Sequence, residues 1–309
     1  MKKILAIQSN ALNEINIETD TTLLLALEAQ KRNYQIIWYE TKDLNLINSK
    51  VLVEGKKVIF FDKSKKFYKV IKTIKFDLAK AKVIFIRQNP PFNMDYINST
   101  HFLDHIKTKK IINNPTSIRN VSEKFYSTKF LRYMPETIFT KNIKQISSFL
   151  RKNKKIVVKP IHGYAGKNII YINKTLNQGI LKKYLKKFDH VMVQKYLNKV
   201  QEGDKRVFII NGKIKGAIRR LPRKGSILSN ISQGGIALKT KLNLRELKIS
   251  KIVANSLKKN GIFFAGIDLV GGYLIGDINV TSPTGLPQYK NLTGKNLAID
   301  FWNELEKLK

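Results

Sequence analysis

Oxygen-bearing side chains at Asp268, Asp277 and Asn279 form the pattern that most favours metal chemistry. Asp268 and Asp277 stand within the apolar stretches GIDLV and IGDINV, where an unpaired carboxylate would be costly. Asp277 and Asn279 are two residues apart and therefore share one face of a strand. Because proteins usually hold Mg²⁺ by one or two carboxylates together with substrate phosphates, we predict a Mg²⁺ site here. The alternative is a solvated strand face.

A glycine-rich segment, 163–168, could bring backbone N–H groups close to a phosphate. It contains Gly163 and Gly166 and joins two predicted strands. Ile161 stands where a Walker A loop needs its first glycine, so the segment does not match that motif. Taken alone, the segment is better explained as an ordinary hairpin turn.

Four of the ten arginines fall in one short stretch, as Arg206, Arg219, Arg220 and Arg223, just before a predicted flexible segment at 229–235. Such a group could clamp a phosphate while the flexible segment closes over a reactive intermediate. The alternative is a nucleic-acid-binding or merely solvated patch. The metal cluster, the glycine segment and the arginines together indicate ATP-dependent chemistry better than any one of them alone.

The net charge is the most conspicuous bulk property: Lys and Arg number 58 against 22 Asp and Glu, a formal charge of +36 in 309 residues. Such an excess first suggests attraction to nucleic acid or to an anionic membrane. Only ten of the basic residues are arginine, however, and the lysines are spread from Lys2 to Lys309. Abundant Asn and Ile accompany them, as expected of an AT-rich coding composition. We therefore favour a compositional origin of the charge over a specific nucleic-acid partner.

The absence of cysteine excludes disulfides, thiolate nucleophiles and cysteine-ligated zinc or iron–sulfur sites. The apolar run at 4–7 is too short for the core of a signal peptide, and no run approaches the roughly 18 residues of a membrane span. We therefore expect a cytoplasmic protein with no membrane partner. Hydrophobic residues make up 43% of the chain, enough for a buried core, and the length suggests about two domains.

In the first third of the chain, apolar runs alternate with helical patterns. Strands are predicted at 3–7, 35–39, 83–86 and 111–113, with a hairpin at 51–61 around Glu54-Gly55. Helices are predicted at 21–32, with Asp20 as the N-cap candidate, and from about residue 96. Strands separated by helices indicate a parallel, doubly wound sheet, which binds ligands at the carboxyl ends of its strands. The break at Asn113-Asn114-Pro115 predicts a domain boundary near residue 118.

The remainder of the chain has an α+β pattern with antiparallel strands. Strands are predicted at 156–160, 169–172 and 191–194, and helices from about 122, at about 175–188, at 244–260 and at about 297–308. Asn211-Gly212 is a two-residue hairpin signal between strands at 206–210 and 213–218, and Gly271-Gly272 joins strands at 263–270 and 273–280. The two parts of the chain therefore differ in architecture.

These motifs resemble those of the prokaryotic glutathione synthetases, members of the ATP-grasp ligases, over nearly the whole chain. The matching stretches are INIETDTTLLLALEAQKR (15–32), IRQNPPFNMDYI (86–97), NNPTSIRNVSEK (113–124), VVKP (157–160), VQKYL (193–197), EGDKRV (202–207), GIDLVG (266–271) and DINVTSPTG (277–285). The R-x-x-PPF and INVTSPTG segments are specific, so coincidence is a poor explanation.

The resemblance implies an α/β fold, with an N-terminal Rossmann-like substrate domain at 1–118 and a two-subdomain α+β ATP-grasp domain at 119–309. A small lid subdomain would cover about 125–195. The implied activity joins γ-glutamylcysteine and glycine to give glutathione, with ATP as co-substrate and an acyl phosphate as intermediate. The resemblance also implies a homo-oligomer, typically a tetramer.

Carried over by position, the resemblance assigns roles to individual residues. Those that would bind ATP are Lys124, Lys159, Gly163, Gly166, Gln194, Tyr196, Leu197 and Asp204. Those that would hold two Mg²⁺ ions, which Mn²⁺ could replace, are Asp268, Asp277 and Asn279. Arg206 and Arg220 would steady the transferred phosphoryl group and the tetrahedral intermediate. Asn16, Asp20 and Arg87 would help to place the peptide substrate.

Several positions depart from the family's pattern. Asp277 stands where the family has Glu, and Ala165 replaces a glycine of the phosphate loop. Leu228 and Ile236 take lid positions where the family commonly has Arg, and Pro287 falls where an Arg often follows SPTG. These departures motivate one alternative, a related ATP-grasp ligase with a different acid or amine substrate. A nucleic-acid-binding protein is the alternative from another class, and only the charge supports it.

Overall fold

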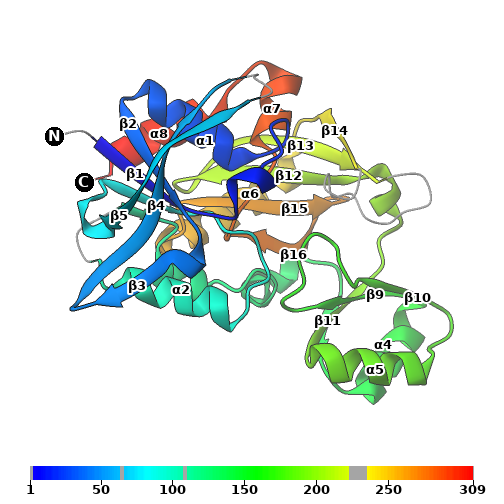
Figure 1. The fold of residues 1–309 in the computed structure, drawn as a ribbon. Coiled ribbons are helices and arrows are strands. Elements are labelled where there is room, and N and C mark those ends of the chain that lie inside the picture. Colours follow the sequence, from blue (N-terminus) through cyan, green and yellow to red (C-terminus); the bar gives the residue numbers. More distant parts are fainter. Residues whose placement is uncertain (1–2, 63–65, 107–109, 223–234, 309) are drawn as a thin grey trace.

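The computed structural model describes residues 3–62, 66–106, 110–222 and 235–308 (Figure 1). A small body built from residues 137–195 extends from a larger body that contains the first and the last described residues. The larger body holds two β-sheets and the small body holds a third. Within the described residues, no helix is both long and apolar enough to span a membrane.

The N-terminal part of the chain forms a seven-stranded sheet. Its strands are β1 (Lys3–Gln8), β2 (Tyr34–Tyr39), β3 (Leu44–Ile47), β4 (Lys50–Phe60), β5 (Tyr68–Asp77), β6 (Val83–Ile86) and β7 (Lys110–Ile112). Strands β2, β1, β6 and β7 pair in parallel in that order, which confirms the predicted parallel sheet. Strands β3, β4 and β5 extend it with antiparallel pairing, so the complete sheet is mixed.

Helices cover both faces of the parallel strands. Successive side chains of a strand point to opposite faces, so each face presents apolar residues that a helix layer buries. The helices are α1 (Thr21–Lys31) and α8 (Leu297–Glu306) on one face, and α2 (Met94–Asp104) and α3 (Pro115–Asn120) on the other. Leu5 packs in the first layer and its neighbour Ala6 in the second. Trp302 of α8 donates its indole N–H to the carbonyl of Leu25 at 2.9 Å. The last helix of the chain therefore completes the layer beside the first sheet.

Side-chain caps fix where two of these helices begin. Asp20 accepts the N–H of Leu23 at 2.8 Å, which confirms it as the N-cap of α1. Asn93 accepts the N–H of Tyr96 at 3.0 Å, so α2 begins at Met94, two residues earlier than predicted. In both cases the cap satisfies a backbone donor that the first turn of a helix leaves without an intrahelical partner.

The predicted hairpin at 51–61 is wrong, because residues 50–60 form the single strand β4. The turn that joins β3 to β4 instead contains Asn48 and Ser49, with φ of 48° and 62°. Gly55 lies inside the strand, where a Cβ atom would come within 2.4 Å of Ile37 Cγ2. This glycine permits a close approach between neighbouring residues of the sheet, a use of glycine that a sequence pattern does not separate from a turn.

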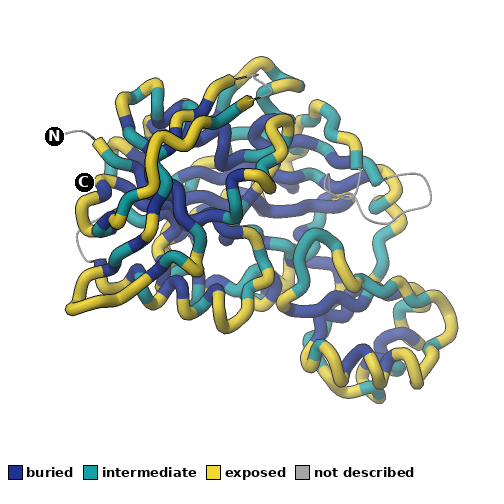
Figure 2. The backbone as a smooth tube through the Cα atoms, viewed as in Figure 1, coloured by how far each residue is buried: buried dark blue, intermediate teal, exposed yellow. Residues whose placement is uncertain are grey.

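The small body is a four-stranded antiparallel sheet with two helices on its outer face (Figure 2). Its elements are β8 (Thr137–Thr140), α4 (Ile143–Asn153), β9 (Lys155–Pro160), β10 (Ile170–Asn173), α5 (Gln178–Phe188) and β11 (Val191–Lys195). Strands β9, β10 and β11 and helix α5 were predicted, whereas β8 and α4 were not. Val158 and Val193 pack under the helices, and the alternate residues Val157 and Gln194 face the larger body.

A five-stranded antiparallel sheet completes the larger body, in the order β14-β13-β12-β15-β16. Its strands are β12 (Asp204–Ile210), β13 (Lys213–Leu221), β14 (Ile236–Lys239), β15 (Phe264–Val270) and β16 (Tyr273–Asn279). Helix α6 (Leu244–Lys259) covers one face, and α7 (Leu286–Thr293) with α8 covers the other. The two hairpins predicted in this part of the chain, at 206–218 and 263–280, are confirmed. Their turn residues all have positive φ: Asn211 50°, Gly212 72°, Gly271 55° and Gly272 80°.

A single buried side chain, Asn113, joins the first sheet to the five-stranded sheet. Its Nδ2 donates to the carbonyls of Phe264 and Val280, each at 2.7 Å. Its Oδ1 accepts the N–H groups of Phe263 at 2.9 Å and Phe264 at 2.8 Å. The chain then forms α3, which spans the predicted boundary near residue 118, and the helix expected from about 122 is the 3₁₀ helix η4 (Phe125–Tyr133).

Glu304 ties the last helix to the β12–β13 hairpin. The carboxylate accepts from Lys213 Nζ at 3.0 and 3.1 Å and from Asn211 Nδ2 at 3.1 Å, and the residue is 5% exposed. Burial by itself would raise the pKa of Glu304, but the hydrogen bonds from Lys213 and Asn211 outweigh it and lower the pKa to about 2. The carboxylate is therefore charged in the folded protein at neutral pH.

Candidate active site

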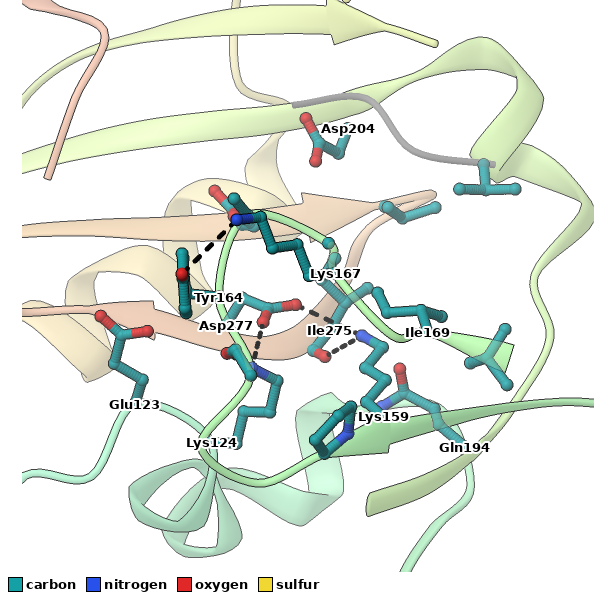
Figure 3. A pocket seen from close by; sticks show the side chains of 18 of the residues that line it. Glu123, Lys124, Lys159, Tyr164, Lys167, Ile169, Gln194, Asp204, Ile275 and Asp277 are labelled. Atoms are coloured by element: carbon teal, nitrogen blue, oxygen red, sulfur yellow. Dashed lines mark hydrogen bonds and ion pairs between the residues drawn. The ribbon is translucent and has the colours of Figure 1, made fainter. Parts of the chain in front are cut away.

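A cavity lies between the inner face of the small sheet and the end of the five-stranded sheet (Figure 3). The small body contributes β9, the loop 161–169 and β11, and the five-stranded sheet contributes β12, β15 and β16. In Figure 3, Lys124, Lys159 and Asp277 point toward one another from three separate parts of the chain. The fold therefore gathers into one cavity residues that are far apart in the sequence.

Two buried lysines flank Asp277. Lys124 Nζ lies 3.4 Å from Oδ1 and Lys159 Nζ lies 3.3 Å from Oδ2, and the lysine side chains are only 4% and 6% exposed. Lys159 Nζ also donates to the carbonyl of Ile275 at 2.9 Å, and Lys124 Nζ donates to that of Gly163. Burial would raise the pKa of Asp277, but Lys159 and Lys124 hold it well below its usual range. Two ammonium groups around one carboxylate leave a net positive charge, which suits a phosphate chain.

Two arginines and two aspartates alternate beside the cavity; Asp204, Arg206 and Asp268 line it, whereas Arg220 lies behind the aspartates and is not among its described lining residues. Arg206 binds Asp268 through Nε at 2.6 Å and Nη2 at 2.7 Å. Arg220 binds Asp204 through Nε at 2.7 Å and Nη2 at 2.6 Å, and its Nη2 also lies 2.9 Å from Asp268 Oδ2. All four residues are at least nine-tenths buried. Burial would raise the pKa of Asp268, but Arg206 and Arg220 outweigh it and lower the pKa.

The glycine-rich loop after β9 borders the same cavity, with Gly163, Ala165 and Gly166 in its lining. Ala165 and Gly166 have φ of 51° and 73°, so the alanine that replaces a family glycine adopts the left-handed conformation. The ammonium of Lys167 lies 4.9 Å from the centre of the Tyr164 ring. The loop therefore combines backbone N–H groups with a cation at the edge of the cavity.

The cavity also has an apolar end, on the side where Figure 3 shows Ile169 and Gln194. The apolar residues of the lining include Val157, Ile169, Tyr196, Leu197, Val200 and Val270, and the polar residues Gln194 and Lys195 stand beside them on β11. The Tyr196 ring packs against that of Tyr171, with ring centroids 4.7 Å apart. An apolar slot with few polar groups is the usual environment for an aromatic base.

The residues predicted to hold Mg²⁺ all line this cavity. Asn279 donates an N–H through Nδ2 to the carbonyl of Gly266 at 3.2 Å, so Oδ1 is its atom that can coordinate a metal. In the described part of the chain, no group of three or more His, Asp or Glu residues gathers into a metal site. Asp268, Asp277 and Asn279 thus offer hard oxygen ligands but too few for a closed site. They fit an ion whose coordination is completed by substrate phosphates.

The residues predicted to place the peptide lie outside the cavity lining, in the connections that follow the inner strands β1 and β6 of the first sheet. Arg87 donates through Nε to Thr22 Oγ1 at 3.1 Å and through Nη2 to the carbonyl of Pro283 at 3.0 Å. Burial lowers the pKa of Arg87 to about 10, against the influence of the nearby Asp20. Asn16 is exposed and accepts a backbone N–H of its own loop. The structure brings Asp20 near Arg87, and Asn16 is joined to Asp20 only through the backbone, by the hydrogen bond from the Asp20 N–H to the Asn16 carbonyl at 2.9 Å.

Other sequence predictions have mixed outcomes. Arg223, Leu228 and the segment 229–234 lie outside the described residues. Ile236 is 62% exposed at the start of β14, and Pro287 is buried in the first turn of α7. Arg219 points away from the ladder of arginines and aspartates, because it neighbours Arg220 on the same strand.

Glu123 is a cavity residue that the sequence analysis missed. It lines the cavity beside Lys124 and accepts the hydroxyl of Thr281 at 3.0 Å. Burial raises the pKa of Glu123, against the opposing effect of Lys124. Its position next to Lys124 in the matched stretch NNPTSIRNVSEK was the available signal.

Solved structures share this arrangement of sheets. D-cycloserine synthetase DcsG has a TM-score of 0.69 and 15% identity, with 99% of this chain and 100% of that chain covered. D-alanyl-alanine synthetase A from Vibrio cholerae has a TM-score of 0.63 and 14% identity, with 99% and 98% covered. At these identities the likeness concerns the fold. The protein class follows from a family profile: residues 123–294, which contribute most of the cavity between the two β-sheets, match an ATP-grasp domain.

The sequence comparisons identify the family. The profile of the prokaryotic glutathione synthetase N-terminal domain matches residues 3–119, and that of the prokaryotic glutathione synthetase ATP-grasp domain matches residues 123–294. Glutathione synthetase of Mesorhizobium japonicum is 35% identical over 310 residues, with 99% of both chains covered. Glutathione synthetase of Buchnera aphidicola subsp. Baizongia pistaciae is 35% identical, with 98% of this chain and 95% of that one covered. The chain belongs to the prokaryotic glutathione synthetase family.

Proposed function

We propose that this protein joins γ-glutamylcysteine and glycine to give glutathione, with conversion of ATP to ADP and phosphate. The observation that carries the proposal is the cavity lined by Lys159 of the small sheet, Arg206 and Asp277 of the five-stranded sheet, and Lys124 at the start of η4. Membership in the prokaryotic glutathione synthetase family supplies the identity of the substrates.

The reaction needs ATP because a carboxylate is a poor acyl donor. A carboxylate oxygen of γ-glutamylcysteine attacks the γ-phosphorus of ATP, ADP leaves, and an acyl phosphate forms. The amine nitrogen of glycine then attacks the acyl carbon, loses a proton, and phosphate leaves as the amide bond forms. No protein nucleophile is required, so the absence of cysteine is compatible with this route.

The chain's own residues bind and orient the reactants. Lys124 and Lys159 bind the phosphate chain, and the loop with Gly163 and Gly166 covers it and excludes water. The guanidinium groups of Arg206 and Arg220 stabilise charge that develops on the transferred phosphoryl group and on the tetrahedral intermediate. These two groups are already held in place by buried aspartates, so little reorganisation accompanies the reaction.

ATP-grasp ligases use a divalent cation together with ATP. When bound, Mg²⁺ would neutralise part of the negative charge on the phosphates. Asp268, Asp277 and Asn279 would hold two such ions, and Mn²⁺ could serve in place of Mg²⁺. A bound cation would also compete with the lysines and arginines that now neutralise Asp277 and Asp268.

The base and ribose of ATP would occupy the apolar end of the cavity, beside Gln194, Tyr196 and Leu197. By the family resemblance Asp204 would lie near the ribose. It lines the cavity, and both of its oxygens accept from Arg220. The ribose contact therefore requires one oxygen to be shared between Arg220 and a hydroxyl.

The remaining assignments follow the family resemblance. Residues 1–118 would form the substrate domain and 119–309 the ATP-grasp domain, with a lid at about 125–195. Asn16, Asp20 and Arg87 would bind the peptide beside the carboxyl ends of β1 and β6 in the first sheet. The protein would be cytoplasmic and would form a homo-oligomer, a tetramer by resemblance, which size-exclusion chromatography with light scattering tests.

Mass spectrometry of the product provides the direct test of the activity. Purified protein with ATP, Mg²⁺, γ-glutamylcysteine and glycine should give glutathione, and omission of any one of these should abolish it. Lys159→Met should remove the activity, whereas Lys155→Met, an exposed lysine on the same strand, should retain it. No tripeptide product from the wild-type protein would disprove the proposal.

A second candidate is an ATP-grasp ligase with another acid or amine. It is favoured by Ile236 and Pro287, which replace arginines common in the family. A panel of amines tested with γ-glutamylcysteine, and of acids tested with glycine, separates the candidates. Faster turnover with another pair than with γ-glutamylcysteine and glycine would favour this second candidate.

A further inference from the structure

Thr137 and Gln194 are directly opposite each other in the antiparallel pair β8–β11. Gln194 also lies opposite Val157 of β9, which lines the apolar end of the cavity. Directly opposite residues place their side chains on the same face of a sheet. Thr137 and Gln194 are therefore adjacent on the cavity side of the small sheet.

A chain of hydrogen bonds fixes the orientation of the Gln194 amide. The hydroxyl of Thr137 donates to the carbonyl of Pro135 at 2.7 Å. A hydroxyl has one proton to donate, so Thr137 Oγ1 can only accept from Gln194. Gln194 accordingly donates through Nε2 to Thr137 Oγ1 at 2.9 Å.

The opposite orientation of the amide would cost a hydrogen bond. It would place Gln194 Oε1 against the Thr137 oxygen, two acceptors facing each other, unless Thr137 released the carbonyl of Pro135. Gln194 is 2% exposed, so such a loss would not be compensated by bulk water. The chain from Pro135 to Thr137 to Gln194 therefore makes Oε1 the atom of Gln194 that is left for a ligand.

No hydrogen bond to Gln194 Oε1 occurs among the residues that the structure describes. Figure 3 shows Gln194 at the side of the cavity, next to Lys159. Gln194 Oε1 is therefore open to a donor from a ligand in the cavity. Adenine presents its exocyclic 6-amino group as a donor, whereas hypoxanthine and guanine present a 6-oxo acceptor.

We propose that Thr137 is a positioning residue that selects a 6-aminopurine, because it holds the Gln194 amide with its oxygen toward the base. This inference rests on the proposed use of ATP and on the placement of the base beside Gln194. Thr137 itself does not contact the base. Its effect on nucleotide choice passes through the orientation of the Gln194 amide.

The test compares ATP with inosine triphosphate, which differs at the 6-position and at the N1 proton that accompanies it. Isothermal titration of the full-length protein with each nucleotide and Mg²⁺ gives the ratio of the two dissociation constants. The wild type should prefer ATP by about tenfold or more, because the 6-oxo group would face an acceptor. Thr137→Val keeps the shape of the side chain but removes the hydroxyl, so the Gln194 amide can rotate and the ratio should fall below about threefold.

Thr137→Ser restores the hydroxyl and should restore the wild-type ratio. General damage to the pocket would weaken both nucleotides alike and leave the ratio unchanged. If Thr137→Val does not fold, as judged by circular dichroism, Gln194→Met provides the same test and should bring the ratio near one. A wild-type preference that persists in Thr137→Val or in Gln194→Met, a loss of preference in Thr137→Ser, or no preference in the wild type would overturn the proposal.

Failure of this inference is distinguishable from failure of the proposed activity, because nucleotide binding is measured without γ-glutamylcysteine or glycine. Preference for ATP without any glutathione formation would leave the Thr137 assignment intact and disprove the activity. Glutathione formation together with equal affinity for ATP and inosine triphosphate would support the activity and disprove the Thr137 assignment.

Discussion

Replacing Arg220 by methionine is expected to impair both the stability and the turnover of the protein, through two separable effects. The guanidinium makes two hydrogen bonds to Asp204, at 2.7 and 2.6 Å, and lies 2.9 Å from Asp268. Methionine fills most of the same volume without the charge. Asp204, which is only 6% exposed, then loses the cation that pairs with both of its oxygens.

Removing one partner of a buried ion pair typically costs about 3–5 kcal/mol in the free energy of unfolding. Loss of a group that stabilises charge in the transition state typically lowers kcat by about 10²–10³. The affinity for ATP should change much less, because Lys124 and Lys159 remain. Urea denaturation, steady-state turnover and nucleotide titration measure the three quantities separately.

The double variant Asp204→Asn/Arg220→Met separates the two effects. With the unpaired carboxylate also removed, we expect at least about 2 kcal/mol of the lost stability to return, while turnover stays low. Arg219→Met, on the same strand but the other face, is the matched control and should keep turnover near that of the wild type. Recovery of turnover together with stability in the double variant would refute a direct role of Arg220 in the reaction.

Three further predictions concern the scaffold. Gly55→Ala should lower the free energy of unfolding, measured by urea denaturation, by about 1–3 kcal/mol, because the new Cβ would overlap the Ile37 side chain. Gly179→Ala is the control: its Cβ would make only an ordinary contact, so the change should be neutral or slightly stabilising. Equal effects of the two substitutions would contradict this explanation. Asn113→Ala should cost about 2–4 kcal/mol in the free energy of unfolding, through the loss of four buried hydrogen bonds. That is clearly more than the roughly 1 kcal/mol expected for Asn114→Ala, which removes the cap of α3 and one exposed hydrogen bond from the Ser117 hydroxyl. The lowered pKa of Glu304 contributes stability that is present above the pKa of the unfolded chain, near 4.5, and lost as pH falls toward about 2. Glu304→Gln should therefore show a flatter stability profile than the wild type between pH 5 and 2, and parallel profiles would argue against the assignment.

Local patterns in the sequence were sufficient for elements whose stability comes from neighbouring residues. The cap at Asp20 and the turns at Asn211-Gly212 and Gly271-Gly272 were predicted because the backbone conformations they require favour those residue types. Gly55 illustrates the limit of this reasoning. It resembled a turn residue, yet the approach of Ile37 from another strand decided its place inside β4.

Among the candidate site residues, residue types and spacing along the chain identified most of the side chains suited to the chemistry, and the resemblance to a family assigned their roles. Their partners are known only from the folded chain: Asp277 pairs with Lys124 and Lys159, and Asp268 pairs with Arg206. These pairs come from different strands and loops, so no spacing along the chain encodes their distances. The amide orientation of Gln194 depends in the same way on a strand that the sequence analysis did not predict, because a hydrogen bond across a sheet is set by the register of the strands rather than by either strand alone.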